Sequence, residues 1–480
     1  MKRYFLSVLK LSVILFLVIE CPGAAIGQVS PESVGQAYTY KIPERTGDGW
    51  GIATLTDAAL NPAPIYEMVH HIRAGLHPNI HSVLLIKDGR LVLEEYFHGY
   101  NRDRLHFQAS VTKSIVSLLV GIAIDKKLIP SIDEPFLRYF SEYLPRIGDA
   151  TRKKAITLRH LLTMSAGLEW HAAGIERRDV RHSTYQMWNS GDPVGFVLER
   201  RMVTEPGKMW YYNSGLTILL GEVVRKAAGM TIDEFARLHL FTPLGIRRFQ
   251  WDGSPSGVVQ TDGGLHLRPR DMGKIGLLVL QGGAWSGKNV VSQSWIEEST
   301  RRHIHAWTVG YGYQWRRGNA LISSQEVEVV YGSGHGGQKI FIVPEFDLIA
   351  VFTSKVFDNP GGHEQPEGML IRYILPALVS LGLPPESFDI SRKSLKVFAG
   401  RYKFRYGPDV ASVAVEDGKL VGYSPDGVRI EGVFRSTHEF FGISKRFGPF
   451  KIEFIENKSG VVESLLFRYG LKQLHFDRIE

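Results

Sequence analysis

Two groups of β-type sequence stand at opposite ends of a mostly helical stretch, and this separation limits the possible folds more than any other feature of the chain. In the first group, 82–87 and 90–96 flank Asp88-Gly89, a pair typical of a tight hairpin turn. The second group consists of three alternating runs, at 326–331, 338–343 and 348–353. Strands at both ends with helices between them predict an α+β domain in which the two ends join one antiparallel sheet.

The stretch between these strands has helical periodicity. Its most apolar segment, 114–126, lacks proline until Pro130, which predicts a buried helix with Ser110 and Lys113 in its first turn. Three further helices are predicted, at 156–168, 216–228 and 271–281. We therefore expect a helical subdomain beside the sheet.

The C-terminal part of the chain has a different pattern. Residues 391–480 form short alternating runs separated by turn-forming pairs such as Asp417-Gly418, which predicts a small all-β domain. The segment 382–386 contains glycine and two prolines and is typical of a linker. We therefore expect a main domain at 28–385, followed by the small β domain at 391–480.

The N-terminus has the features of a secretory signal peptide. Basic residues precede an apolar run at 11–19, and small residues follow at positions 25 and 27. The apolar run is too short for a stable membrane span, which needs about 20 residues. Cleavage near Gly27 would leave a periplasmic or secreted protein. Lipidation at Cys21 is an alternative, but Glu20 disfavours it because the residue before a lipidated cysteine is normally small.

Composition excludes several classes of protein. The 57 Lys and Arg residues outnumber the 49 Asp and Glu residues by 8, but they occur in pairs rather than in a stripe, so no nucleic-acid partner is predicted. The single cysteine excludes disulfide and Cys-zinc frameworks. Four histidines lie close together in sequence without the spacing of a known metal site, and we interpret them as surface or packing residues: His70, His71, His77 and His81.

Ser110 and Lys113 form a Ser-x-x-Lys motif at the start of the predicted buried helix. The three-residue spacing places both side chains on one helical face, about 5–6 Å apart. A serine becomes nucleophilic when a nearby base takes its proton, and a lysine at the edge of a core can act as that base or as a fixed cation. The motif alone is weak, because chance matches are common and a helix cap followed by a solvated lysine has the same pattern.

Two further segments give the motif its specificity. A Pro-Gly pair at 206–207 precedes Tyr-Asn-Ser-Gly at 212–215, and His-Gly-Gly at 335–337 begins a predicted strand. In this order the segments resemble those of the serine hydrolases of the class C β-lactamase and D-alanyl-D-alanine carboxypeptidase superfamily. The stretches 268–274 and 336–344 are similar to the branch that includes 6-aminohexanoate-dimer hydrolase and related esterases.

This resemblance covers about residues 80–380 and implies a β-lactamase/transpeptidase-like fold, with an antiparallel sheet flanked by helices. It makes Ser110 the acylated nucleophile, Lys113 its partner and Tyr212 the second base. The family's Tyr-x-Asn pattern also fits a start at Tyr211, which leaves that residue as an alternative base. The spacing from the Pro-Gly pair and the Ser-Gly that follows favour Tyr212.

The resemblance also assigns the substrate side of the site. His335 stands where β-lactamases have the lysine of Lys-Thr-Gly, and Ser214 is expected to contact substrate. The oxyanion hole would consist of the backbone N–H groups of Ser110 and of Gln338, the residue after Gly337. No metal or cofactor is implied.

The sequence therefore predicts an exported serine hydrolase that cleaves a small-molecule amide or ester through an acyl-enzyme at Ser110. A β-lactamase or a D-Ala-D-Ala carboxypeptidase acting on the cell wall is the alternative within enzymes. A catalytically silent envelope-binding protein is the alternative outside them, and it would have no need of Lys113 and Tyr212. The sequence makes no prediction of the oligomeric state.

Overall fold

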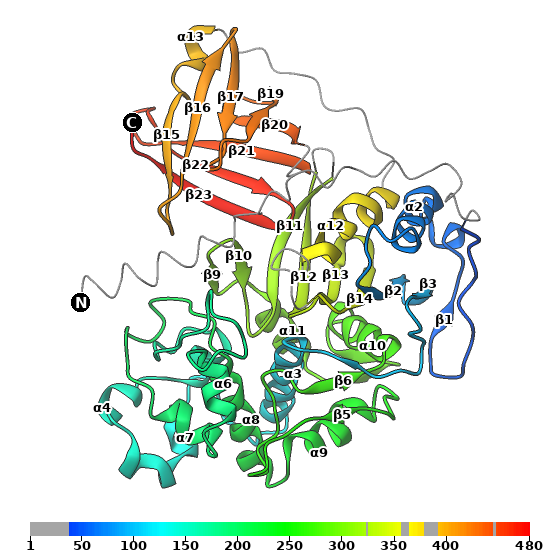
Figure 1. Ribbon diagram of the computed structural model, residues 1–480. Helices are drawn as coiled ribbons and strands as arrows, with labels where there is room; N and C mark the ends of the chain where they lie inside the picture. The colour runs from blue at the N-terminus through cyan, green and yellow to red at the C-terminus, as the bar shows by residue number, and fades with distance from the viewer. Residues whose placement is uncertain (1–37, 323–324, 357–363, 379–391, 445–447) are drawn as a thin grey trace.

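The computed structural model describes residues 38–322, 325–356, 364–378, 392–444 and 448–480. The predicted signal peptide at 1–27 and the predicted linker at 382–386 lie outside these residues. The described chain forms a large α+β body and an all-β body, which stands next to β11 of the large body (Figure 1).

A nine-stranded sheet forms the centre of the large body. Its strands, in spatial order, are β1 (Gly51–Ile52), β3 (Arg90–Tyr96), β2 (Ile80–Lys87), β14 (Leu348–Ser354), β13 (Gln338–Val343), β12 (Gln325–Gly334), β11 (Arg316–Ile322), β10 (Val309–Tyr311) and β9 (Ile304–Ala306). β1 runs parallel to β3, and the other neighbouring pairs described in this sheet are antiparallel.

The prediction that the two groups of strands join one antiparallel sheet is confirmed. Asp88 and Gly89 have φ angles of 51° and 70°, the left-handed conformation that a two-residue hairpin needs, and they connect β2 to β3. β2 pairs on its other side with β14, where Val83 lies opposite Phe352. Strands that are far apart in the sequence therefore pair within this sheet.

Each face of this sheet is covered by helices. On one face pack α3 (Val111–Asp125) and α10 (Pro269–Leu280), and α8 (Ser214–Ala228) packs against α3 within the same large apolar core. The other face is covered by α2 (Pro62–Arg73) and α12 (Gln365–Met369), in a second core.

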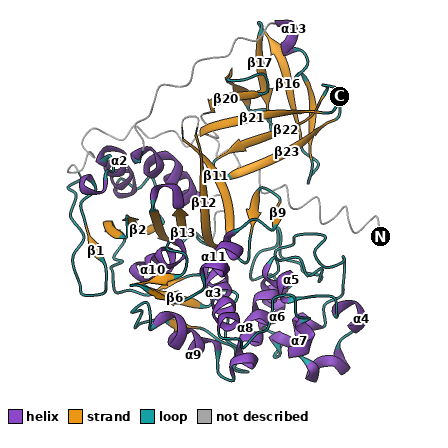
Figure 2. Cartoon of the chain, turned by 180° about the vertical axis from the view of Figure 1, so that it is seen from behind, coloured by secondary structure: helices purple, strands orange, loops and turns teal. Residues whose placement is uncertain are grey.

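The shorter helices of the middle region are α4 (Ala150–Lys153), α5 (Leu158–Leu162), α6 (Ser183–Trp188), α7 (Pro193–Leu198), α9 (Ile232–Ala236) and α11 (Gln293–Thr300). Figure 2 shows α4 to α9 gathered on the side of the large body that lies away from the C-terminal strands. The helix predicted at 156–168 is much shorter than expected. It ends as α5 because Met164 has a φ of 56° and Gly167 a φ of 76°, and neither conformation continues a right-handed helix.

The predicted all-β C-terminal domain is confirmed. After the one-turn helix α13 (Arg392–Leu395), its strands in spatial order are β18 (Arg429–Glu431), β17 (Lys419–Tyr423), β16 (Val410–Glu416), β15 (Gly400–Phe404), β23 (Lys472–Arg478), β22 (Val462–Tyr469), β21 (Gly448–Glu456), β20 (Glu439–Ser444) and β19 (Val433–Phe434). The two outermost strands are consecutive in the chain, so the sheet curls into a nearly closed barrel. A cluster of aromatic side chains fills its interior, including Phe398, Phe434, Phe440, Phe450, Phe454, Phe467 and Phe476.

Among the described residues, no helix has the length and apolarity that a membrane span requires.

Candidate active site

Ser110 lies immediately before α3, a helix that is buried along most of its length. Every residue of α3 from Val111 to Ala123 is buried, which fixes the helix axis and therefore the position of its N-terminus. The preceding segment is held by a hydrogen bond from the Gln108 N–H to the Leu265 carbonyl, 2.8 Å long. Ser110 itself is only half-buried, so its hydroxyl stands at the edge of the core.

Lys113 extends back along α3 toward this hydroxyl. Its Nζ donates a hydrogen bond of 3.2 Å to Oγ of Ser110 and another to the backbone carbonyl of Asp262. Only 2% of Lys113 is exposed. The ammonium is therefore positioned by hydrogen bonds to protein atoms. Its contact with Ser110 agrees with the three-residue spacing, which places both side chains on one helical face.

Tyr212 also reaches Ser110, with its ring centroid 5.2 Å from Nζ of Lys113. Its phenol O–H donates a 2.7 Å hydrogen bond to Oγ of Ser110. The chain after it is fixed because the Asn213 side chain caps α8, accepting a 2.9 Å hydrogen bond from the Gly215 N–H. Three functional groups, a hydroxyl, an ammonium and a phenol, thus meet at one point.

The charges around Tyr212 favour its ionised form. Burial raises the pKa of the phenol, but the Lys113 ammonium, the hydrogen bond with Ser110 and the Arg316 guanidinium act in the other direction, and the net pKa lies below its ordinary value. Tyr211, the other tyrosine considered as a base, differs in this respect. Burial raises the pKa of its phenol, and its backbone N–H donates to the Met164 carbonyl at 2.8 Å.

The β12–β13 turn brings the third predicted segment to the same place. β12 can approach the chain before α3 because Gly334 has no side chain: a Cβ there would lie 2.3 Å from the Gln108 carbonyl oxygen. His335 is exposed at the turn. Gly337 has a φ of 92°, and a Cβ on it would lie 2.9 Å from Cβ of Ser354, so no larger residue fits.

The two remaining predicted residues are buried. The side chain of Gln338 is used within the protein: its amide donates to the Ser354 carbonyl at 2.6 Å and accepts from the Ser354 N–H at 3.2 Å. Its backbone is thereby fixed beside the turn. Ser214 is 8% exposed and is the first residue of α8, two positions after Tyr212.

An aromatic cluster around Tyr212 was not predicted from the sequence. Trp210 lies 6.1 Å from Tyr212, 5.3 Å from Trp307 and 5.5 Å from Tyr311, measured between ring centroids. We call these four residues the aromatic cluster. Trp210 could have been found from its place beside the Tyr-Asn-Ser-Gly segment, whereas Trp307 and Tyr311 come from β9–β10, where the sequence has no motif.

The histidines near the N-terminal strands form pairs with other side chains. Nδ1 of His81 lies 2.9 Å from Nε2 of His106, and Nδ1 of His71 lies 2.7 Å from the hydroxyl of Tyr373. Within the part of the chain that the structure describes, no three His, Cys, Asp or Glu side chains are grouped as metal ligands would be.

The chain is similar to a known hydrolase. The chain is 24% identical over 376 residues to 6-aminohexanoate-dimer hydrolase of Paenarthrobacter ureafaciens, an alignment that covers 71% of this chain and 92% of that protein.

Two solved structures share the fold. A penicillin-binding protein homologue from Caulobacter crescentus superposes with a TM-score of 0.53 at 16% identity, over 68% of this chain and 99% of that one. The hydrolase EstCE1, described as having promiscuous acyltransferase activity, superposes with a TM-score of 0.52 at 14% identity, over 68% and 100%. The profile of the Beta-lactamase family matches residues 74–371, which is more than half of the chain. The protein therefore belongs to the Beta-lactamase family of serine hydrolases, with the β-lactamase/transpeptidase-like fold that its motifs predicted.

Proposed function

We propose that the protein is an exported serine hydrolase that cleaves an amide or ester bond through an acyl-enzyme at Ser110. One observation carries this proposal: Oγ of Ser110 lies 3.2 Å from the Lys113 ammonium and 2.7 Å from the Tyr212 phenol. A hydroxyl held between a cation and a phenol of lowered pKa has what nucleophilic catalysis requires.

In the first half-reaction, Tyr212 as phenolate takes the proton of the Ser110 hydroxyl while Oγ forms a bond to the substrate carbonyl carbon. Lys113 stabilises the negative charge on both oxygens during this transfer. The tetrahedral intermediate then collapses, the bond to the leaving group breaks, and Tyr212 returns the proton to the leaving nitrogen or oxygen. Water repeats the sequence on the acyl-enzyme and releases Ser110.

Negative charge develops on the carbonyl oxygen in both halves. The backbone N–H of Ser110 at the N-terminus of α3 and the N–H of Gln338 beside the β12–β13 turn are the donors we assign to it. Loss of one such donor typically costs about 3–4 kcal/mol of transition-state stabilisation. We assign substrate contacts to Ser214 and His335, and Gly337 keeps the turn narrow.

The similarity to 6-aminohexanoate-dimer hydrolase supports a linear amide or an ester as substrate. A β-lactam or a cell-wall D-Ala-D-Ala peptide is the alternative. A parallel assay of p-nitrophenyl esters, short ω-amino-acid amides, nitrocefin and D-Ala-D-Ala peptides separates them. Turnover of the first two classes supports the proposal, and exclusive turnover of nitrocefin or of the peptides contradicts it.

Export rests on the signal peptide expected at 1–27 and is part of the proposal, as is a domain boundary between residues 385 and 391. N-terminal sequencing of protein secreted by its native host tests export. A mature chain that begins near Gln28 supports it, whereas an intact Met1 or a lipid on Cys21 contradicts it.

A further inference from the structure

The all-β body contacts the large body through ion pairs to Glu326 on β12 and through the turn between β22 and β23. We call residues 470–473 the docking turn: they comprise the two residues between β22 and β23 and the first two residues of β23. Leu471 is 2% exposed and belongs to the core of the large body rather than to that of the barrel. Gly318 on β11 lets the turn approach closely, because a Cβ there would lie 2.5 Å from the Leu471 carbonyl oxygen. Nζ of Lys472 adds hydrogen bonds of 2.9 Å to each carboxylate oxygen of Glu364.

The docking turn also holds the β9–β10 hairpin. The Gln473 N–H donates a 2.7 Å hydrogen bond to the carbonyl of Thr308 at the tip of this hairpin. The neighbouring tip residue, Trp307, has a φ of 57°, a left-handed conformation that a bulky aromatic residue adopts only when its surroundings enforce it. An external contact at the tip is therefore part of what keeps the hairpin in shape.

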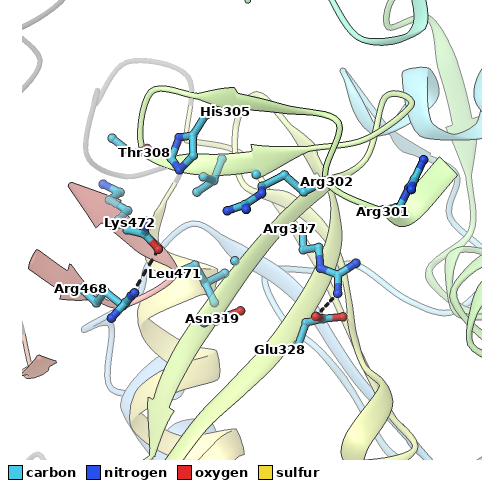
Figure 3. Close-up of a pocket in the computed structure, with 14 residues that line it drawn as sticks. Arg301, Arg302, His305, Thr308, Arg317, Asn319, Glu328, Arg468, Leu471 and Lys472 are labelled. Carbon is cyan, nitrogen blue, oxygen red and sulfur yellow. Dashed lines mark hydrogen bonds and ion pairs between the residues drawn. The ribbon is translucent and has the colours of Figure 1, made fainter. Parts of the chain in front are cut away.

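A cavity of about 380 Å³ separates the rest of the hairpin from the docking turn (Figure 3). His305 and Thr308 border it on the hairpin side, and Arg468, Leu471 and Lys472 on the barrel side. The hairpin is anchored through β10, which pairs with β11, so beside this open space the Gln473 contact adds a support at the hairpin tip.

The inner side of this hairpin carries half of the aromatic cluster. Trp307 and Tyr311 both contact the ring of Trp210, and Trp210 contacts Tyr212. Aromatic pairs at these separations prefer defined edge-to-face geometries, so a shift of the hairpin is transmitted to the ring of Tyr212. A displacement of about 1 Å at a reacting group can cost a hundredfold in rate.

We propose that the C-terminal β domain is a working part of the active site: its docking turn holds the β9–β10 hairpin, and Trp307 on that hairpin is a positioning residue for Tyr212. This inference rests on the proposed function, in which Tyr212 is the base. It assigns the barrel a role in catalysis through contacts with the protein's own hairpin, without a ligand of its own.

Three variants test it in the full-length mature protein, with p-nitrophenyl acetate as substrate. Leu471→Gly removes the side chain that anchors the docking turn in the large body. Trp307→Ala removes one ring of the aromatic cluster, and Trp307→Phe keeps an aromatic ring there. We expect the first two to lower kcat about tenfold with KM changed less than twofold. Trp307→Phe should recover most of the loss.

The pH–rate profile separates positioning from general damage. Lys113, Ser110 and Arg316 lower the pKa of Tyr212 only while they stay close to it, so a displaced ring should move the acidic limb of the profile to higher pH. A merely structural defect would reduce the amount of active protein and leave the profile where it is.

Leu420→Ala is the matched control, because Leu420 is buried in the barrel core and is 4% exposed. It should destabilise the barrel without moving the acidic limb. The inference is overturned if Leu471→Gly and Trp307→Ala fold and keep the wild-type kcat and profile, or if Leu420→Ala shifts the profile as they do. Failure of the proposed function itself is recognised separately, since wild-type Ser110 would then not react with a fluorophosphonate.

Discussion

The phenol oxygen of Tyr212 lies 2.7 Å from Oγ of Ser110, although the two residues are 102 positions apart in the chain. The contact joins the N-terminal ends of two buried helices, α3 and α8, which pack against each other in the core. The packing of these helices therefore fixes the ends of the chain segments that carry both groups.

Tyr212→Phe is expected to lower kcat by about three orders of magnitude, because general-base catalysis typically contributes 10²–10⁴-fold. Tyr211→Phe is the matched control: it removes a hydroxyl one residue away, and activity should stay within about threefold of wild type. Steady-state kinetics on a p-nitrophenyl ester checks both. A larger loss in the Tyr211 variant would assign the base to that residue instead.

Lys113→Arg should abolish nearly all activity. A guanidinium is a planar fork and keeps its proton, so it cannot replace a compact ammonium that contacts both Ser110 and the Asp262 carbonyl. Lys126→Arg, an exposed change at the other end of the same helix, should leave the rate unaltered. Near-normal turnover by the Lys113 variant would show that this lysine has only a packing role.

Substrate choice should follow from His335, which stands where β-lactamases have a lysine. Histidine is mostly neutral above its reference pKa of about 6.5, so the site offers less positive charge to the carboxylate of a β-lactam. Charge-assisted hydrogen bonds are about twice as strong as neutral ones. We expect kcat/KM for short esters or linear amides to exceed that for penicillins and cephalosporins by at least about a hundredfold, or about 2.7 kcal/mol.

His335→Lys should lower the ratio of kcat/KM for esters or amides to kcat/KM for β-lactams. Nitrocefin and p-nitrophenyl butyrate, measured with the same preparation, provide the comparison. Equal efficiency on the two substrates in the wild type, or an unchanged ratio in the variant, would show that the charge at this turn does not determine selectivity.

Folding stability is expected to fall as the pH is lowered through the weakly acidic range. Burial lowers the pKa of His81 to about 3 and that of His106 to about 4, and nearby His98, Arg104 and His266 act in the same direction. Both imidazoles are therefore neutral in the folded protein and protonated in the unfolded chain below about pH 6.5. The unfolded state then binds more protons, so stability decreases with falling pH, by at most about 2.7 kcal/mol per pH unit for two groups, until the folded pKa values are reached.

Urea denaturation between pH 7 and pH 4.5 measures this slope. His81→Phe keeps a ring to stack on Tyr100, whose centroid lies 3.8 Å away, and should flatten the slope markedly. His171→Gln changes a side chain that is 52% exposed and should leave it unchanged. An equal slope in the His81 variant would mean that other groups cause the acid sensitivity.

The sequence predicted most of the sheet and the position of Lys113 beside Ser110, because both depend on local patterns. Tyr212 was assigned through the resemblance of its Tyr-Asn-Ser-Gly segment to those of known serine hydrolases. Alternation and the Asp88-Gly89 turn define strands, and a three-residue spacing on a helix brings Lys113 to the serine. The turn at Gly334 to Gly337 was also recognisable from its glycines. Each of these signals lies within a few residues of the feature that it predicts.

What the sequence did not show depends on tertiary contacts. α2 was not among the predicted helices, although Asn61 caps it and four of its residues are buried. The helix at 156–168 was predicted too long because the left-handed Met164 leaves no local signal. Trp307 and Tyr311 could not be assigned to the site, because only the folded β9–β10 hairpin brings them to Trp210.

Covalent labelling of Ser110 tests the central claim most directly. Mature enzyme treated with a fluorophosphonate, digested and analysed by mass spectrometry should carry the probe on the peptide that contains Ser110, since only an activated hydroxyl reacts at a useful rate. Ser110→Ala should remain unlabelled. A probe on another serine, or no probe on the folded wild-type protein, would contradict the acyl-enzyme mechanism.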